Sequence, residues 1–228
     1  MTDSISSHYT GAAGQRYLIA RQQDRVDQLG DILQSRFFAP HLLPTDRVLD
    51  FGCANGSITR QLRPCVRSIV GLEVNEHSRA LAIASGLEVY TSLAAVPSET
   101  RFDAIVSNHV LEHIPNVHGT LVQLRELLAP GGRLIVMLPI EDFREARNRV
   151  WRHSDTDNHL YSWTPLLFGN LLAEAGFLPQ TLLIVTQAQS RKLFFLGDGI
   201  LQAMAGRLLS IVRRKRQLFG IARSPIRG

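Results

Sequence analysis

Short apolar runs alternate with amphipathic stretches along most of the chain. The apolar runs predict strands over Arg47–Phe51, Ser68–Glu73, Leu87–Tyr90, Phe102–Ser107, Arg133–Leu138, Phe177–Thr186 and Leu218–Ala222. Helical spacing of apolar residues predicts helices over 14–38, Ser57–Leu62, Ser78–Ser85, Thr120–Leu128, Pro165–Ala175 and Leu193–Val212. Strands that alternate with helices in this way are typical of βαβ units, so the pattern indicates an α/β fold built on a parallel sheet.

The length of 228 residues, with 45% hydrophobic residues, is enough for one domain with a full core. This composition excludes a disordered, collagen-like or disulfide-stapled chain. The two cysteines, Cys53 and Cys65, are twelve residues apart and match no metal-ligand spacing, so we expect reduced thiols. Residues 1–11 are polar and lack the apolar stretch of a secretory signal, so we expect a cytoplasmic protein.

The formal charge of +5 is unevenly distributed along the chain. Residues 191–228 carry nine basic residues and one acid, which gives +8, and residues 1–190 therefore carry −3. The chain is a mildly acidic body with a basic end, and the positive charge lies outside the predicted sheet core.

The strongest local motif runs from Val48 to Gly56, where an apolar strand meets a small-residue turn and then a helix. Such a turn lets a ligand approach the backbone, and the start of the helix favours negative charge. The dinucleotide fingerprint G-x-G-x-x-G does not fit, because its third glycine would fall at Ser57. Asp50 lies two residues before Gly52, and an acid there suits a ligand that carries a cation.

This stretch resembles motif I of the class I S-adenosylmethionine (SAM)-dependent methyltransferases, with Ala54 in place of the usual glycine. The extra methyl group is expected to be tolerated. Four further stretches resemble the motifs of that family in the same order, namely 70–74, 91–93, 101–114 and 127–134. The match covers about residues 44–140. It implies a Rossmann-like seven-stranded sheet, mostly parallel with an antiparallel last strand, and with helices on both faces.

The resemblance also implies the positions of a SAM site, which would release S-adenosylhomocysteine after transfer. Glu73 would accept the two ribose hydroxyls, and Asp50 would face the ammonium while amides near Gly52 face the carboxylate. Leu93 and Val74 would enclose the adenine. The full set of predicted cofactor residues is Asp50, Gly52, Cys53, Gly56, Glu73, Val74, Ser92, Leu93, Asn108 and His109.

The acceptor is predicted from the segments after the fourth and fifth strands. Asn108 is not followed by the Pro-Pro-aromatic sequence of base-modifying amino-methyltransferases, and residues 158–165 resemble a loop of small-molecule methyltransferases. These features favour transfer to oxygen or carbon of a small organic acceptor, with a lipidic acceptor as one option. An RNA or protein methyltransferase and an inactive SAM-binding regulatory protein are the alternatives. His159 is the candidate general base, with Tyr161 and Trp163 as substrate contacts; His159 could instead only hydrogen-bond its loop.

No metal site is expected from His153, Asp155, Asp157 and His159, because metal-dependent O-methyltransferases take their ligands from other positions. Glu112 and His113 fit either a catalytic role or solvated positions at a helix start.

The chain is interpreted as a single methyltransferase domain in five parts. These are an N-terminal helical lid (1–44), a SAM-binding core (45–140), a substrate-side segment (141–190), an inserted amphipathic basic helix (191–216), and the last strand with its tail (217–228). Tyr9, Tyr17 and Arg21 would close the lid on the cofactor, or the N-terminal segment would only pack on the sheet.

The basic end has three interpretations. Its apolar stripe, over 193–212, could pack on the domain as a lid, lie on an anionic membrane surface, or bring the basic residues 213–216 to a nucleic acid. The third interpretation is the weakest, because the segment lacks interleaved aromatic residues and any RNA-binding module. The oligomeric state stays open.

Overall fold

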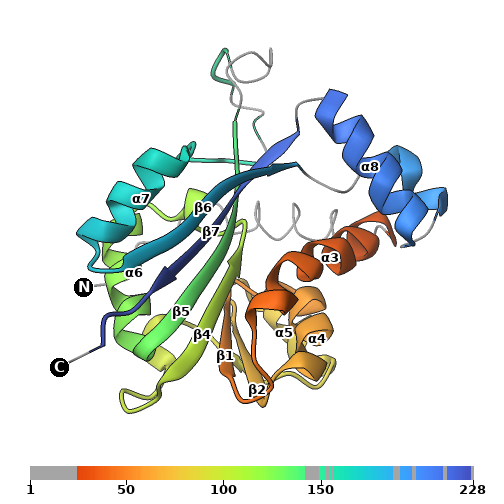
Figure 1. Ribbon diagram of the computed structural model, residues 1–228. Coiled ribbons are helices and arrows are strands. Elements are labelled where there is room, and N and C mark those ends of the chain that lie inside the picture. Colours follow the sequence, from red (N-terminus) through yellow and green to blue (C-terminus); the bar gives the residue numbers. More distant parts are fainter. Residues whose placement is uncertain are drawn as a thin grey trace.

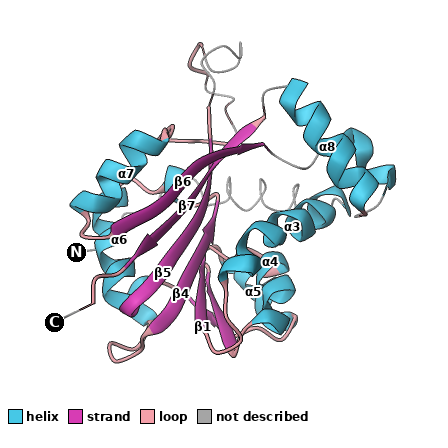
Figure 2. Ribbon diagram, viewed as in Figure 1, coloured by secondary structure: helices cyan, strands magenta, loops and turns pink. Residues whose placement is uncertain are grey.

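The computed structural model describes residues 25–141, 149–152, 155, 157–186, 191–196, 199–212 and 215–226. Its centre is a seven-stranded sheet of order β3-β2-β1-β4-β5-β7-β6 (Figures 1 and 2). The strands are β1 (Arg47–Phe51), β2 (Ser68–Leu72), β3 (Val89–Tyr90), β4 (Phe102–Asn108), β5 (Leu128–Pro139), β6 (Leu178–Thr186) and β7 (Arg216–Arg223). The first five pair in parallel, and β7 runs antiparallel to both β5 and β6. The predicted fold class is confirmed.

Helices cover both faces of this sheet. They are α3 (Arg25–Phe38), α4 (Ser57–Leu62), α5 (Glu76–Ala84), α6 (Val117–Leu127), α7 (Pro165–Glu174) and α8 (Ile200–Val212). Figure 1 shows α3, α4 and α5 on one side of the sheet and α6 and α7 on the other.

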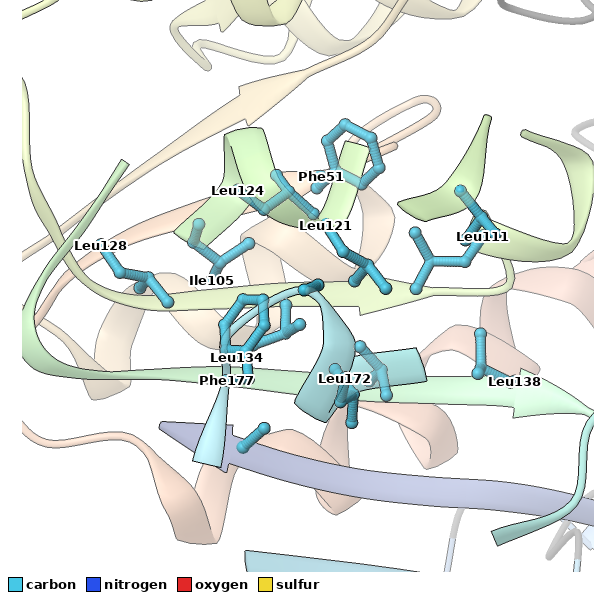
Figure 3. Packing of buried hydrophobic residues seen from close by; sticks show 14 of the residues in the cluster. Phe51, Ile105, Leu111, Leu121, Leu124, Leu128, Leu134, Leu138, Leu172 and Phe177 are labelled. Atoms are coloured by element: carbon cyan, nitrogen blue, oxygen red, sulfur yellow. The ribbon is translucent and has the colours of Figure 1, made fainter. Parts of the chain in front are cut away.

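Each face of the sheet has its own hydrophobic core, because successive strand residues point to opposite faces. On β4, Ile105 packs in the larger cluster with α6 and α7, whose buried leucines and phenylalanines are shown in Figure 3. Its neighbours Ala104 and Val106 pack in the second cluster with Phe38 of α3. The same alternation aims Asp50 of β1 and Asn108 of β4 toward the face that carries α3 and α4.

Several predicted boundaries shift because side chains cap the helices. Helix α6 begins at Val117, before the predicted Thr120, because the Asn116 side chain accepts a hydrogen bond from the Gly119 N–H. Asn75 caps α5 in the same way. Strand β5 starts at Leu128, which pairs with Phe102 before the register shifts, so the predicted turn at Pro130 lies inside the strand.

The single helix predicted over 193–212 is wrong. The segment forms a 3-10 helix, η6 (Arg191–Leu196), and then α8, with Gly199 in a bend between them. Gly197 and Gly199 flank Asp198 in the sequence, and glycine disfavours a helix interior. The insertion of this segment between β6 and β7 is confirmed.

The apolar stripe of α8 does not pack on the domain. Ile200, Met204 and Leu208 are 77%, 65% and 66% exposed, so the packed-lid interpretation of the stripe is wrong. No helix within the described ranges is long and apolar enough to cross a membrane. The proposed lid residues Tyr9, Tyr17 and Arg21 lie outside the described residues.

Candidate active site

The candidate site lies at the carboxyl ends of β1 and β4, in the middle of the sheet. After β1 the chain continues toward β2 on one side, and after β4 it continues toward β5 on the other. A crevice opens where neighbouring parallel strands send their connections in opposite directions, and ligands of open α/β sheets bind there. Asp50 lies on β1 and Asn108 ends β4, so both predicted residues reach this edge.

The turn after β1 adopts a backbone that requires small residues. Gly52 and Gly56 have φ values of +80° and +76°, in the left-handed region. A Cβ on Gly52 would lie 2.3 Å from Val110 Cγ2, and one on Gly56 would lie 2.2 Å from Leu87 Cδ1. Ala54 has φ +48°, so it also adopts the left-handed conformation, which glycine, the usual residue of motif I at this position, adopts more easily.

The amides of this turn already have partners within the protein. The Gly52 and Cys53 N–H groups both donate to the Leu72 carbonyl, at 2.8 and 3.0 Å. The Gly56 N–H donates to the Cys53 carbonyl. Strand pairing and the turn use these three amides, and the contact of amides near Gly52 with a ligand carboxylate stays a prediction. The Cys53 thiol is buried beneath Gly71, and burial raises its pKa, so it is a packing residue.

Asp50 is a buried acid whose charge has no cationic partner among the described residues. It is 3% exposed and accepts a hydrogen bond of 2.6 Å from the Thr59 hydroxyl of α4. Burial raises the pKa of Asp50 to about 7, the Thr59 hydrogen bond partly opposes this, and the charges of Glu73 and Asp31 add to it. A cationic group brought to this carboxylate would restore its ionised form.

A cleft with an empty volume of about 350 Å³, partly open to solvent, adjoins Asp50. It is lined by Asp31, Asp50, Gly52, Cys53, Ala54, Asn55, Ser57, Ile58 and Asn108. Gln34 of α3 donates to Asn108 Oδ1 at 2.8 Å and to Gln217 Oε1 of β7 at 2.9 Å. These bonds fix the Asn108 side chain at the wall of the cleft.

Glu73 lies directly after β2, on the side of the crevice away from β4. Its Oε2 accepts from the Ala54 N–H at 2.9 Å, and its Oε1 accepts from the Asn75 N–H at 2.7 Å. Burial raises the pKa of this carboxyl, while hydrogen bonds from the Asn75, Ala54 and Val74 backbone and the charge of Arg79 partly oppose the rise. Val74 and Leu93, at the ends of neighbouring strands, are half-buried and pack against the core, and Ser92 precedes Leu93.

A second group of titratable side chains continues from the end of β4. His109 has φ +55° and its Nδ1 lies 3.4 Å from Glu112 Oε1. Glu112 lies in the 3-10 helix η4 (Leu111–His113), is fully buried, and its carboxylate accepts no hydrogen bond from the described part of the chain. The His113 Nε2 lies 3.7 Å from the same Glu112 oxygen. Burial lowers the pKa of His113 to about 4, which keeps this imidazole neutral.

His159 joins this group from the segment that precedes α7. Its Nδ1 lies 2.7 Å from Glu141 Oε1, and its ring centroid lies 4.9 Å from that of His113. The Leu160 N–H donates to the Glu112 carbonyl, which holds the segment against η4. Burial lowers the pKa of His159, but the hydrogen bond to Glu141 and the nearby carboxylates outweigh burial, so the pKa lies above 6.5.

Three of these side chains could hold a metal ion. Ligand atoms of Glu112, His113 and His159 all lie within 4.8 Å of one another, and imidazole with carboxylate is a donor set used for zinc. This set differs from His153, Asp155, Asp157 and His159, of which His153 lies outside the described residues.

The two predicted substrate contacts differ in position. The Tyr161 hydroxyl donates to the Pro115 carbonyl at 2.6 Å, and the Tyr161 ring stacks on Trp163 at 5.4 Å. Trp163 is 5% exposed and meets Phe168 edge to face within the core. Tyr161 therefore lies between the core and the surface, and Trp163 has a packing position that a substrate would not reach without rearrangement.

Comparison with known proteins gives a family match over most of the chain. The family model described as a methyltransferase domain matches residues 19–181. The ubiquinone biosynthesis O-methyltransferase of Nitrosococcus oceani is 30% identical over 125 residues, which cover 50% of this chain and 53% of that protein. The chain spans between about a third and about half of the length of curated relatives that it matches.

Solved structures share the fold at low identity. A methyltransferase of Haloferax volcanii, solved in complex with the Trm112 methyltransferase activator, has a TM-score of 0.66 at 16% identity, covering 92% of this chain and 97% of that one. The phosphoethanolamine N-methyltransferase 2 of Haemonchus contortus, solved with SAM, has a TM-score of 0.60 at 14% identity, covering 82% and 50%. At these identities the likeness concerns the fold.

Proposed function

Since the chain belongs to the class I SAM-dependent methyltransferase family, we propose that it transfers a methyl group from SAM to oxygen or carbon of a small organic acceptor. The His159–Glu141 pair is the observation that carries this proposal. A hydroxyl or acidic carbon must lose a proton when it is methylated, and an imidazole held by a carboxylate is suited to accept that proton.

The residues of the crevice fit the chemistry of SAM. The buried Asp50 carboxylate beside the cleft suits the ammonium group of the ligand, and Asp31 adds a second acid to the lining. The Glu73 carboxylate accepts from the Ala54 and Asn75 N–H groups, and a carboxylate has about four acceptor sites, so it can also receive ribose hydroxyls. When bound, SAM supplies an electrophilic methyl group on its sulfonium.

His159 has the arrangement of a general base. When its neutral ring donates from Nδ1 to Glu141, the lone pair of Nε2 is left to accept a proton. Glu141 then stabilises the imidazolium that forms, and the orientation of the ring is fixed. His109 follows Asn108 in the chain and lies 3.4 Å from Glu112, which lies 3.7 Å from His113 beside the His159 ring.

The proposed class of acceptor follows from the proton that the acceptor loses when it is methylated. Oxygen acceptors such as phenols need this step, and the relative in Nitrosococcus oceani is named for ubiquinone biosynthesis, which supports an aromatic or quinone-like hydroxyl. Phenolic test compounds are therefore the first choice of acceptor for assays.

Calorimetry of the full chain with SAM tests the cofactor residues. Glu73→Ala removes both acceptor atoms and should weaken SAM binding by about 1–3 kcal/mol. Glu76→Ala, an exposed acid three residues away, is the matched control and should leave affinity unchanged. Equal affinities of the two variants would refute the assignment of Glu73.

Incubation of a cell extract with SAM carrying a labelled methyl group, followed by separation into small-molecule, RNA and protein fractions, tests the reaction. His159→Ala should abolish most turnover while SAM affinity stays within about twofold, and the exposed control His118→Ala should keep full turnover. Label in RNA or protein fractions, or SAM binding with no labelled product, would instead favour the two alternative functions. Loss of wild-type turnover after dialysis against EDTA, restored by zinc, would assign His159 to metal binding with Glu112 and His113.

A further inference from the structure

Helix α8 exposes its apolar side to solvent and turns its polar and small residues toward the protein. Six of its seven large apolar side chains, Ile200, Leu201, Met204, Leu208, Ile211 and Val212, are at least 55% exposed, and Leu209 is half-buried. Its buried positions are instead Gln202, Gly206 and Ser210, which recur every four residues on the opposite side. A helix that covers a globular core shows the reverse pattern.

The exposed stripe of α8 continues into a basic segment. Arg207 is exposed within the helix, residues 213–216 are all basic, and the side chains of Lys215 and Arg216 are exposed. The sequence contains no acidic residue from Gly199 to Gly228. An apolar face followed by a cluster of positive charge is complementary to a surface that is apolar inside and anionic outside.

The position of α8 relates this face to the candidate active site. Strand β6 runs parallel to β5 because both are antiparallel to β7, so α8 starts from the edge of the sheet where β1 and β4 also end. Val150 and Trp151, which follow β5, are 64% and 77% exposed. Figure 1 shows α8 beyond this edge of the sheet. Tryptophan is favoured at membrane interfaces.

We propose that α8 binds peripherally to the surface of an anionic lipid bilayer and turns the active-site edge toward the membrane. A helix of 13 residues is about 20 Å long, which is too short to cross a bilayer but sufficient to lie in its headgroup region. A second copy is a poorer occupant, because a symmetric contact would bring two basic segments together without acids to pair with them. The further statement that the acceptor is a lipid-soluble molecule taken from that bilayer rests on the proposed function.

Flotation of the full chain with lipid vesicles tests this inference. Vesicles of phosphatidylcholine alone are compared with vesicles containing about one third phosphatidylglycerol. The test variant is the double substitution Leu208→Glu, Ile211→Glu in α8. The control is the double substitution Leu81→Glu, Ile83→Glu, at exposed positions of α5. It changes the net charge by the same amount, and α5 is not part of the apolar and basic surface of α8. All proteins are also examined by size-exclusion chromatography and thermal unfolding.

The wild type and the α5 double variant should float with anionic vesicles, and the α8 double variant should lose at least tenfold in bound fraction. Neutral vesicles and high salt should weaken binding of the wild type. Absence of wild-type binding to anionic vesicles, or equal binding by the α8 variant, would overturn the proposal. A wild-type dimer that the α8 variant converts to monomer, without vesicle binding, would identify a second copy as the occupant. SAM affinity is measured separately, so failure of membrane docking and failure of the methyltransferase function are distinguishable.

Discussion

Replacing Asp50 with Asn should stabilise the ligand-free protein while weakening its binding of SAM. Asp50 is buried, its pKa is raised to about 7, and the structure pairs it with a hydroxyl rather than a cation. Asn keeps the shape of the side chain and can still hydrogen-bond Thr59, but it carries no charge to desolvate.

The size of the expected gain in stability follows from the difference between the pKa values of Asp50 in the folded and the unfolded chain. Between pH 3.8 and about 7 the folded chain binds more protons at Asp50 than the unfolded chain, so its free energy of unfolding falls as the pH rises through this window. The full difference corresponds to about 4 kcal/mol as an upper bound. We therefore expect Asp50→Asn to raise the free energy of unfolding by about 3 kcal/mol at pH 8, and by about half as much at pH 5.

Urea unfolding at both pH values measures this gain, and calorimetry with SAM measures the loss of binding. A gain of about 3 kcal/mol corresponds to a rise in Tm of roughly 6–12 °C for a chain of this length. Loss of a charge-assisted contact with the ammonium should weaken SAM binding by about 1.5–3 kcal/mol. Asp46→Asn is the matched control, because the equally buried Asp46 pairs with Arg133 and its replacement should destabilise the fold. Destabilisation by Asp50→Asn at pH 8, or unchanged SAM affinity, would refute the reasoning.

Two further predictions concern the turn and the general base. Gly52→Ala should destabilise the protein by about 2 kcal/mol more than Gly86→Ala in urea unfolding, because both residues have positive φ but only a Cβ on Gly52 would meet another group, Val110; equal losses would exclude the steric cause. Glu141→Gln should lower the pKa of His159, so the rise of turnover with pH should move to lower pH and the maximal rate should fall; an unmoved profile would show that His159 is not the titrating base.

The positions of the strands and the residues at the site edge were largely predictable from the sequence. Apolar runs bounded by turns located the strands, and the order of motifs placed Asp50, Glu73 and Asn108 at the carboxyl ends of neighbouring strands. Parallel pairing then brings such ends to one edge, whatever the details of packing. Gly52 and Gly56 were identifiable from the sequence because positions with a left-handed backbone favour glycine.

The partners of the site residues were not predictable in the same way. Thr59 and Asp31 reach Asp50 from helices, and Glu141 reaches His159 from the end of the strand region, so these contacts depend on tertiary packing. Sequence motifs gave no signal for Asp31 or for Gln34, whose bond to Asn108 spans 74 residues.

The orientation of α8 was also beyond the sequence pattern. Helical spacing identifies an apolar stripe but does not state which side of the helix faces the protein. Only the buried positions Gln202, Gly206 and Ser210 revealed that the stripe faces outward.

Titration of the full chain with SAM by calorimetry tests the central claim most directly, because the crevice between β1 and β4 is assigned to this cofactor. The account predicts saturable binding of one SAM per chain, competition by S-adenosylhomocysteine, and weaker binding by Asp50→Asn than by the wild type. No heat of binding and no competition at SAM concentrations up to the millimolar range, with a folded protein, would contradict it.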